Sequence, residues 1–340
     1  MIFTDLIIGA AAVAGALAAP RKRQGGFEFT GVNQAGAEFG QNTLPGQLGK
    51  HYTWPANSAI DTLMRDGFNT FRVPIMMERI IPTSLAGSIN ETYAAGLDST
   101  VKYITGKGAY AVIDPHNFGR YYSNVITDVE GFGAWWSKIA ARYANNDLVI
   151  FDTNNEYHDM DNNLVYRLNQ AAIDAIRAAG ATSQYIFVEG NSWSGAWHWT
   201  TPLPPPSVVS SGTAVDMAKL TDPSDKIVYE MHQYLDTDGS GTHAECVSAT
   251  IGRERLVEAT EWLRQNGKRG ILGETAGGVN QQCIAAVKDM LAFMQENSAD
   301  AWAGWLWWAG GPWWGDYMYS MEPPSGAAYT GFLPQIRQFV

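Results

Sequence analysis

Short apolar runs rich in β-branched and aromatic residues recur along the chain, and each is followed by a polar terminus, a loop and a helical pattern. Eight such runs can be identified: FEFTGVN from Phe27, FNTFRVP from Phe68, YAVIDPH from Tyr110, LVIFDTNNE from Leu148, YIFVEGN from Tyr185, IVYEMHQY from Ile227, GILGE from Gly270 and AWAGWLWW from Ala301. Nearly continuous apolar runs are typical of parallel strands covered by helices outside and packed side chains inside. The alternation predicts an α/β fold, a single (β/α)8 TIM barrel.

Helical patterns lie between these strand candidates, as a barrel requires. The segment Leu164–Ala179 carries apolar residues at helical spacing and stops at a glycine. Cys283–Asn297 shows the same spacing, and Ser58 is expected to cap the helix that follows the first strand. The Pro-rich segment Thr200–Thr213 is interpreted as one extended surface loop between the fifth and sixth strands.

The net charge of -11, with no basic stripe, argues against nucleic acid or an anionic membrane as a partner, since both demand clustered Lys and Arg. A neutral substrate is expected instead. Of the 13 Trp, six lie within residues 302–314, which suggests flat stacking surfaces. Any single Trp could equally fill the core.

The first residues predict secretion. The apolar segment 6–19 is too short to span a bilayer and ends in small residues, which is typical of a secretory signal peptide over residues 1–18. Asp5 departs from the usual basic start of such a peptide. The Arg-Lys-Arg run predicts a short dibasic propeptide at 19–23 and a catalytic domain at 24–340, so the expected location is secreted, extracellular.

The two cysteines, Cys246 and Cys283, are expected to form a disulfide in an oxidising compartment, with two free buried thiols as the alternative. The tripeptide Asn90-Glu91-Thr92 is a candidate glycosylation site. No exposed apolar face is discernible, which favours a monomer.

Chemically reactive side chains stand at or near the ends of the predicted strands, where the active sites of such barrels lie. Taken alone, each could be a structural ion pair or a satisfied core histidine, but together at one mouth they indicate a site. They are Arg72, Asp114, His116, Asn155, Glu156, His232, Tyr234 and Glu274, with Trp305, Trp307 and Trp308 on the last strand.

Carboxylates among aromatics, with neither a phosphate-binding glycine loop nor a Ser-His-Asp order, indicate glycoside hydrolysis, which needs one protonated and one ionised carboxyl group. A metal site is the alternative, because Asp114, His116, Glu156 and His232 could be ligands. The Trp-rich surroundings and the lack of a His-x-His pair favour a sugar, so no metal and no cofactor are expected.

Several segments resemble those of fungal glycoside hydrolase family 5 endo-β-1,4-glucanases, cellulases of clan A. These segments are FRVP, DPHN, DTNNEYHD, YEMHQYLD, GETAGG and WWAGGPWWGDYMYSMEP. The resemblance runs from about Phe27 to the C-terminus and implies an enzyme that cuts internal bonds of a β-glucan chain with retention.

The resemblance also implies roles for individual residues. Glu156 matches the acid/base and Asn155 the neighbour that binds the sugar 2-hydroxyl. Glu274 matches the nucleophile, oriented by Arg72 and Tyr234. The other matches are His116 and His232, which hydrogen-bond substrate hydroxyls and the catalytic carboxylates; Trp307 as the stacking platform, with Trp308 left open; and Trp193 and Trp197 on the aglycone side.

The chain departs from the family pattern at Thr275, where relatives have Phe, in the Thr200–Thr213 insertion, and in showing no cellulose-binding module. Two alternatives stay open: an endo-hydrolase of mannan, xyloglucan or mixed-linkage glucan, and a catalytically dead carbohydrate-binding barrel. The presence of both Glu156 and Glu274 argues against the second.

Overall fold

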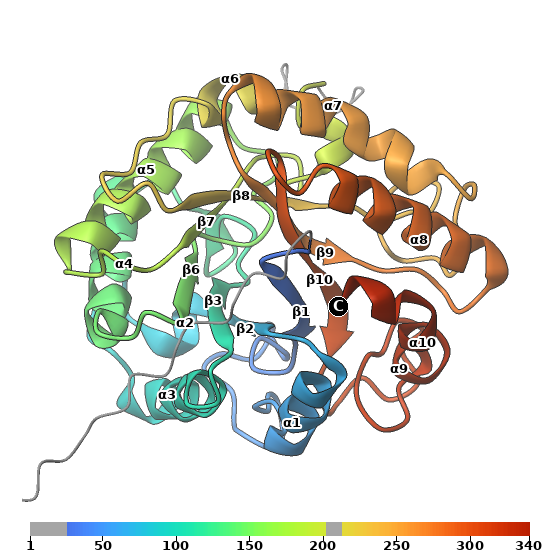
Figure 1. Cartoon of the computed structure of the whole chain (residues 1–340). Helices are drawn as coiled ribbons and strands as arrows, with labels where there is room; N and C mark the ends of the chain where they lie inside the picture. The colour runs from blue at the N-terminus through green and yellow to red at the C-terminus, as the bar shows by residue number, and fades with distance from the viewer. Residues whose placement is uncertain (1–25, 202–212) are drawn as a thin grey trace, which may run out of the picture.

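Eight parallel strands close into a barrel surrounded by helices, which confirms the predicted (β/α)8 fold (Figure 1). The computed structural model describes residues 26–201 and 213–340. The predicted signal peptide and propeptide, and most of the Thr200–Thr213 insertion, lie outside the described residues. Around the barrel the strands follow the order β1-β10-β9-β8-β7-β6-β3-β2, so sequential barrel strands are neighbours throughout.

The strands of the barrel are β1 (Phe29–Gln34), β2 (Thr70–Ile75), β3 (Tyr110–Pro115), β6 (Val149–Asp152), β7 (Ile186–Glu189), β8 (Ile227–His232), β9 (Gly270–Thr275) and β10 (Trp302–Gly310). A small hairpin of β4 (Arg120–Tyr121) and β5 (Asn124–Val125) was not predicted. The helices are α1 (Asn57–Asp66), α2 (Met77–Ile80), α3 (Glu91–Thr105), α4 (Val129–Tyr143), α5 (Asn162–Ala178), α6 (Ala214–Met217), α7 (Ile251–Gln265), α8 (Gln281–Glu296), α9 (Ala327–Gly331) and α10 (Leu333–Ile336), with 3₁₀ turns at Ala196–His198 and Arg337–Phe339.

Polar side chains fix where α3, α4, α5 and α8 begin. Asp161 accepts the backbone N–H of Leu164 at the start of α5, and Asn280 accepts that of Cys283 at the start of α8. The predicted cap at Ser58 is wrong, because α1 begins at Asn57 and Ser58 lies within its first turn. Ala56 precedes the helix without a side-chain cap.

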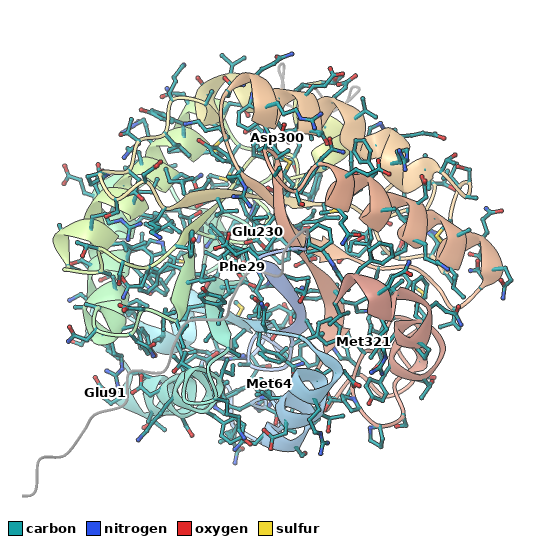
Figure 2. The ribbon with its side chains drawn as sticks, in the orientation of Figure 1. Phe29, Met64, Glu91, Glu230, Asp300 and Met321 are labelled. Carbon is teal, nitrogen blue, oxygen red and sulfur yellow. A yellow bond between two sulfur atoms is a disulfide. The ribbon has the colours of Figure 1, made fainter. Side chains whose placement is uncertain are left out.

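The interior of the barrel changes from apolar to charged along its axis. Its lower part is a buried cluster that includes Phe29, Val112 and Ile150. Because side chains alternate along a strand, the next inward positions on β3 and β6 carry Asp114 and Asp152, both fully buried. Figure 2 shows Phe29 and Glu230, one from each part, within the ring of strands. Folding therefore brings charged side chains from different strands together above the apolar cluster inside the barrel.

A second apolar layer lies between the strands and the helices. It includes Trp302, Trp305 and Trp307, each with no exposed surface. Half of the Trp cluster near the C-terminus thus fills the core, and the interpretation of the whole cluster as stacking surface is wrong.

The predicted disulfide between Cys246 and Cys283 is present, with Cα atoms 5.2 Å apart. It joins the loop after β8 to the first turn of α8. Among the described residues, no helix has both the length and the apolar character needed to cross a membrane.

Candidate active site

A single cation, Arg72 on β2, organises the charged end of the barrel. Its guanidinium lies 2.8–3.0 Å from carboxylate oxygens of five residues: Asp114, Asp152, Glu189, Glu230 and Glu274. These carboxylates come from β3, β6, β7, β8 and β9, and Arg72 is fully buried. We call these six residues the Arg72 cluster.

Five acids around one guanidinium cannot all stay ionised away from water. Burial raises the pKa of Asp152 well above its usual range, and Glu230 adds to the effect. Burial also raises the pKa of Glu189 to about 8, although His232 opposes it. Burial opposes ionisation of Asp114 too, but the nearby Arg72 holds its pKa below the ordinary value. The cluster therefore contains both neutral and ionised carboxyl groups.

Glu274, at the end of β9, is held at both carboxylate oxygens. Its Oε1 accepts an N–H of Arg72 at 3.0 Å, and its Oε2 accepts the hydroxyl of Tyr234 at 2.7 Å. Burial raises the pKa of Glu274, whereas His232 and Arg72 act against that rise. Burial and the nearby carboxylate also raise the pKa of Tyr234, so its phenol stays a donor.

Glu156 lies four residues beyond β6, in a loop above the cluster. Its Oε1 is 2.7 Å from His232 Nδ1, and its side chain is 14% exposed, against 5% for Glu274. The backbone of Glu156 has a φ of 46°, in the left-handed region that non-glycine residues rarely adopt. Its N–H donates to Glu189 at 2.7 Å.

The two carboxyl groups face each other across His232. Oxygens of Glu156 and Glu274 and a nitrogen of His232 all lie within 4.8 Å of one another. A metal would compete there with the donors on Glu274 from Arg72 and Tyr234. His116 and Asp114, ligands in the metal alternative, instead bond each other at 2.8 Å, and among the described residues they belong to no group of ligand atoms close enough to hold an ion.

Three adjoining hollows form one continuous cleft over this pair. The central hollow, of about 620 Å³, contains Glu156, Glu274 and Tyr234. On one side it shares Glu156 and Tyr234 with a hollow of about 440 Å³. On the other it shares His116 and Trp308 with a hollow of about 490 Å³.

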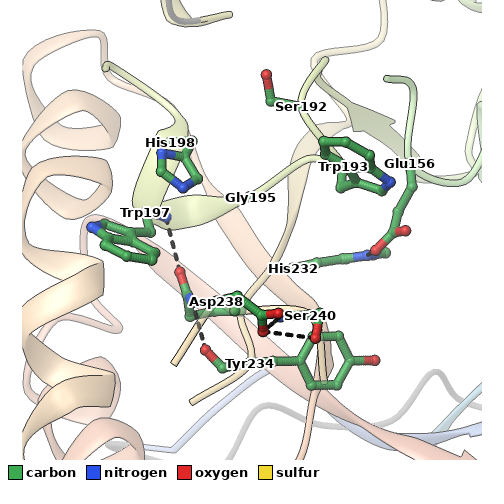
Figure 3. A pocket seen from close by; sticks show the side chains of 12 residues that line it. Glu156, Ser192, Trp193, Gly195, Trp197, His198, His232, Tyr234, Asp238 and Ser240 are labelled. Atoms are coloured by element: carbon green, nitrogen blue, oxygen red, sulfur yellow. Dashed lines mark hydrogen bonds and ion pairs between the residues drawn. The ribbon is translucent and has the colours of Figure 1, made fainter. Parts of the chain in front are cut away.

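The first flanking hollow is lined by two exposed tryptophans (Figure 3). Trp193 is 41% exposed and its ring is stacked on His158, with 4.7 Å between ring centroids. Trp197 is 39% exposed and is covered on one face by Arg255. In the same view the carboxyl group of Glu156 points toward the ring of His232. The structure thus brings Trp193 and Trp197 to the same cleft as the carboxylates.

The stacking platform predicted at Trp307 is wrong. Trp307 is fully buried, packs on Phe332 and donates its indole N–H to Tyr319. Trp308, which the sequence left open, is only partly buried and lines two of the three hollows. The side chain of Trp307 faces the outer helices, so only its neighbour can meet a ligand.

Asn155 is fully buried beside the site, and its Oδ1 accepts an N–H of Arg72 at 2.9 Å. Its Nδ2 finds no hydrogen-bond partner among the described residues. His116 bonds Asp114 and stacks on Trp308, with a centroid separation of 5.2 Å. Burial would lower the pKa of His116, but Asp114 raises it to about 8.

Sequence reasoning missed several residues of the site. Asn33 bonds Arg72 at 3.0 Å, and Asp152, Glu189 and Glu230 surround the same cation. Each lies within a predicted strand run, on the same parity as the inward apolar residues before it. That parity was the available signal. Glu38, which is buried in the second flanking hollow, lies outside the predicted strand runs, so no such signal existed for it.

The glycosylation candidate Asn90 is the N-cap of α3. Its Oδ1 accepts the N–H of Thr92, and its Nδ2, the atom that would carry a glycan, donates to the carbonyl of Arg79. Asn90 stays a candidate glycosylation site.

Comparison with known proteins gives consistent matches. A family model described as cellulase (glycosyl hydrolase family 5) matches residues 32–311. Over 340 residues, all of both chains, the sequence is 55% identical to the probable endo-beta-1,4-glucanase B of Neosartorya fischeri. Over 314 residues, 92% of each chain, it is 58% identical to endo-beta-1,4-glucanase A of Emericella nidulans.

Solved structures match as well. XacCel5A in complex with cellopentaose has a TM-score of 0.87 at 32% identity, covering 92% of this chain and 99% of that one. The Pseudomonas stutzeri endoglucanase Cel5A in complex with cellobiose has a TM-score of 0.81 at 30% identity, covering 94% of each chain.

Proposed function

Because the chain belongs to the cellulases of glycosyl hydrolase family 5, we propose that it is an endo-β-1,4-glucanase that cleaves internal bonds of cellulose and related β-glucans with retention. The proposal rests chiefly on the approach of Glu156 and Glu274, whose carboxylate oxygens lie within 4.8 Å of each other. Retaining enzymes have carboxyl groups about 5 Å apart, whereas inverting enzymes need ~6.5 Å or more to admit a water.

In the first step Glu274 attacks the anomeric carbon while Glu156 protonates the departing glycosidic oxygen. A covalent glycosyl-enzyme results. In the second step Glu156 removes a proton from water, which attacks the same carbon and releases Glu274. Two displacements on opposite faces give retention.

The surrounding contacts support this division of roles. Arg72 and Tyr234 hold Glu274 at both oxygens and stabilise its ionised form. The side chain of Glu156 is the more exposed of the two, and among the described residues its carboxyl group is held by His232. The unpartnered amide of Asn155 is the kind of donor that a sugar 2-hydroxyl would satisfy.

The cleft supports internal attack. Hollows extend on both sides of the carboxylates, with Trp308 on one side and Trp193 and Trp197 on the other. Aromatic faces stack on the apolar faces of pyranose rings, so a neutral polysaccharide chain fits both halves. An open cleft of this kind admits the middle of a chain.

We also propose that the protein is secreted and needs neither metal nor cofactor. The apolar N-terminal segment and the disulfide both support an oxidising extracellular location. The two carboxyl groups suffice for the chemistry. Exhaustive chelation should leave the activity unchanged, and loss of activity that zinc or manganese restores would contradict the carboxylate mechanism.

The central experiment compares wild type with Glu274→Gln on soluble carboxymethyl-cellulose. Wild type should lower viscosity early relative to new reducing ends, and the variant should lose activity by a factor on the order of 10³ or more. Proton NMR of the first products from cellopentaose should show the β-anomer before mutarotation. Early α-anomer would establish inversion, and a panel of mannan, xyloglucan and mixed-linkage glucan would identify a different preferred substrate.

A further inference from the structure

One buried carboxyl group of the Arg72 cluster also contacts the backbone of Glu156. Glu189, at the end of β7, has no exposed surface. Its Oε2 accepts the N–H of Glu156 at 2.7 Å, and its Oε1 lies 3.0 Å from Arg72 Nη2. Both of its oxygens are therefore occupied, and it cannot touch a substrate.

The backbone of Glu156 requires such support. A φ of 46° is unfavourable at a non-glycine residue and persists only when neighbours hold it. This conformation turns the side chain of Glu156 toward His232. The bond from its N–H to Glu189 is a contact from the neighbouring strand that fixes this backbone directly.

Glu189 also reaches the carboxyl end of Glu156 through His232. His232 Nδ1 is 2.7 Å from Glu156 Oε1, and His232 Nε2 is 3.6 Å from Glu189 Oε1. The three residues thus form a closed ring of contacts, which is anchored to Arg72. From these contacts we propose that Glu189 is a positioning residue for the acid/base, holding the left-handed backbone of Glu156 so that its carboxyl group meets the glycosidic oxygen.

The proposal rests on the assignment of Glu156 as the acid/base. It predicts a specific defect, because positioning the acid matters only when the leaving group needs a proton. Burial raises the pKa of Glu189 to about 8, so Glu189→Gln changes the charge little at lower pH. An amide offers one acceptor oxygen where a carboxyl group offers two. The charged Arg72 is the stronger donor and keeps that oxygen, so the bond from the N–H of Glu156 is lost.

The experiment compares kcat/KM for two substrates below pH 7. Cellopentaose has a poor leaving group and needs the acid. The 2,4-dinitrophenolate of 2,4-dinitrophenyl β-cellobioside leaves without a proton. Glu189→Gln should lower kcat/KM for cellopentaose by about tenfold or more, a part of the 10²- to 10⁴-fold that acid–base catalysis supplies. Its kcat/KM for the activated substrate should stay within about threefold of wild type.

Asp152→Asn is the matched control. Asp152 is equally buried and lies 2.8 Å from Arg72, but it forms no hydrogen bond or ion pair with Glu156 or His232 among the described residues. It should affect both substrates by the same factor. An equal loss on both substrates in Glu189→Gln, or no loss on either, would overturn the positioning role.

Glu156→Gln, measured in parallel, separates the two proposals. If Glu156→Gln shows no dependence on the leaving group, the assignment of the acid/base itself is wrong. If Glu156→Gln shows it and Glu189→Gln does not, only the role of Glu189 is wrong.

If Glu189→Gln does not fold, NMR of the wild type decides. The amide proton of Glu156, bonded to a carboxyl oxygen at 2.7 Å, should resonate at low field and exchange slowly with solvent. Rapid exchange of that proton would overturn the proposal.

Discussion

The hydroxyl of Tyr234 offers a sharp test of how the nucleophile is held. It donates to Glu274 Oε2 at 2.7 Å, and both side chains are buried. Hydrogen bonds to charged groups contribute about 1.5–3 kcal/mol. If that bond serves the reaction, Tyr234→Phe should lower kcat/KM on a soluble β-glucan by about 10- to 150-fold.

The pH profile of Tyr234→Phe should move as well. Glu274 must be ionised to attack, so activity falls at low pH as Glu274 takes up a proton. Burial already raises its pKa. Removing a donor that stabilises the ionised form raises the pKa further, so the acid limb should shift to higher pH.

Tyr319→Phe is the control for this prediction. Tyr319 is stacked against Tyr234, with ring centroids 6.5 Å apart, but its hydroxyl donates to the carbonyl of His243. Its removal should leave the acid limb in place. If both variants lose the same activity, or the acid limb of Tyr234→Phe does not move, the bond to Glu274 has no special role.

Three further predictions concern stability and binding. The disulfide between Cys246 and Cys283 spans 37 residues. Replacing both cysteines with Ala should lower the free energy of unfolding by ~4 kcal/mol and the Tm by about 6 °C. A Tm shift below ~1 °C in calorimetry would contradict this. Trp308→Ala should raise the KM for cellopentaose about two- to tenfold. Trp307→Ala should instead lower the free energy of unfolding, measured in urea, by about 3–5 kcal/mol. The reverse pattern would exclude Trp308 as the platform. Burial raises the pKa of Glu38 from 4.5 to about 7, so its contribution to stability is complete below pH ~4.5 and is lost as the pH rises through 7. Glu38→Gln should remove that loss, which is about 3 kcal/mol at most. If the free energy of unfolding depends on pH between 4.5 and 8 in the same way in the variant and the wild type, Glu38 is ionised throughout.

The barrel was predictable because its strands are apolar on both faces and its helices on one. Polar caps then mark where helices begin, as at the start of α5 and α8, and glycines mark where they end. The same property limits what can be read from the last strand. With both faces apolar, alternation does not reveal which Trp faces inward, and the register shift between Trp305 and Trp307 breaks the alternation itself. The wrong choice of Trp307 follows from this.

The Arg72 cluster was predictable only in part. Arg72 and Glu274 carried a recognisable signal, whereas Asp152, Glu189 and Glu230 look like ordinary polar residues within strand runs. Their number becomes meaningful only when closure of the barrel brings carboxylates from five strands to one cation. The loop conformation that turns Glu156 back toward β7 is likewise a product of tertiary contacts, since no glycine marks it in the sequence.

Sharing one guanidinium among carboxylates from five strands has a consequence for evolution and for engineering. Removing one acid redistributes the cation among the other four, so the effects of two substitutions in the cluster will not add. Epistasis of this kind restricts the order in which the positions can change. A designer who moves this centre to another barrel would have to transfer the ring as a unit, because an incomplete ring leaves the buried guanidinium with fewer of its acceptors.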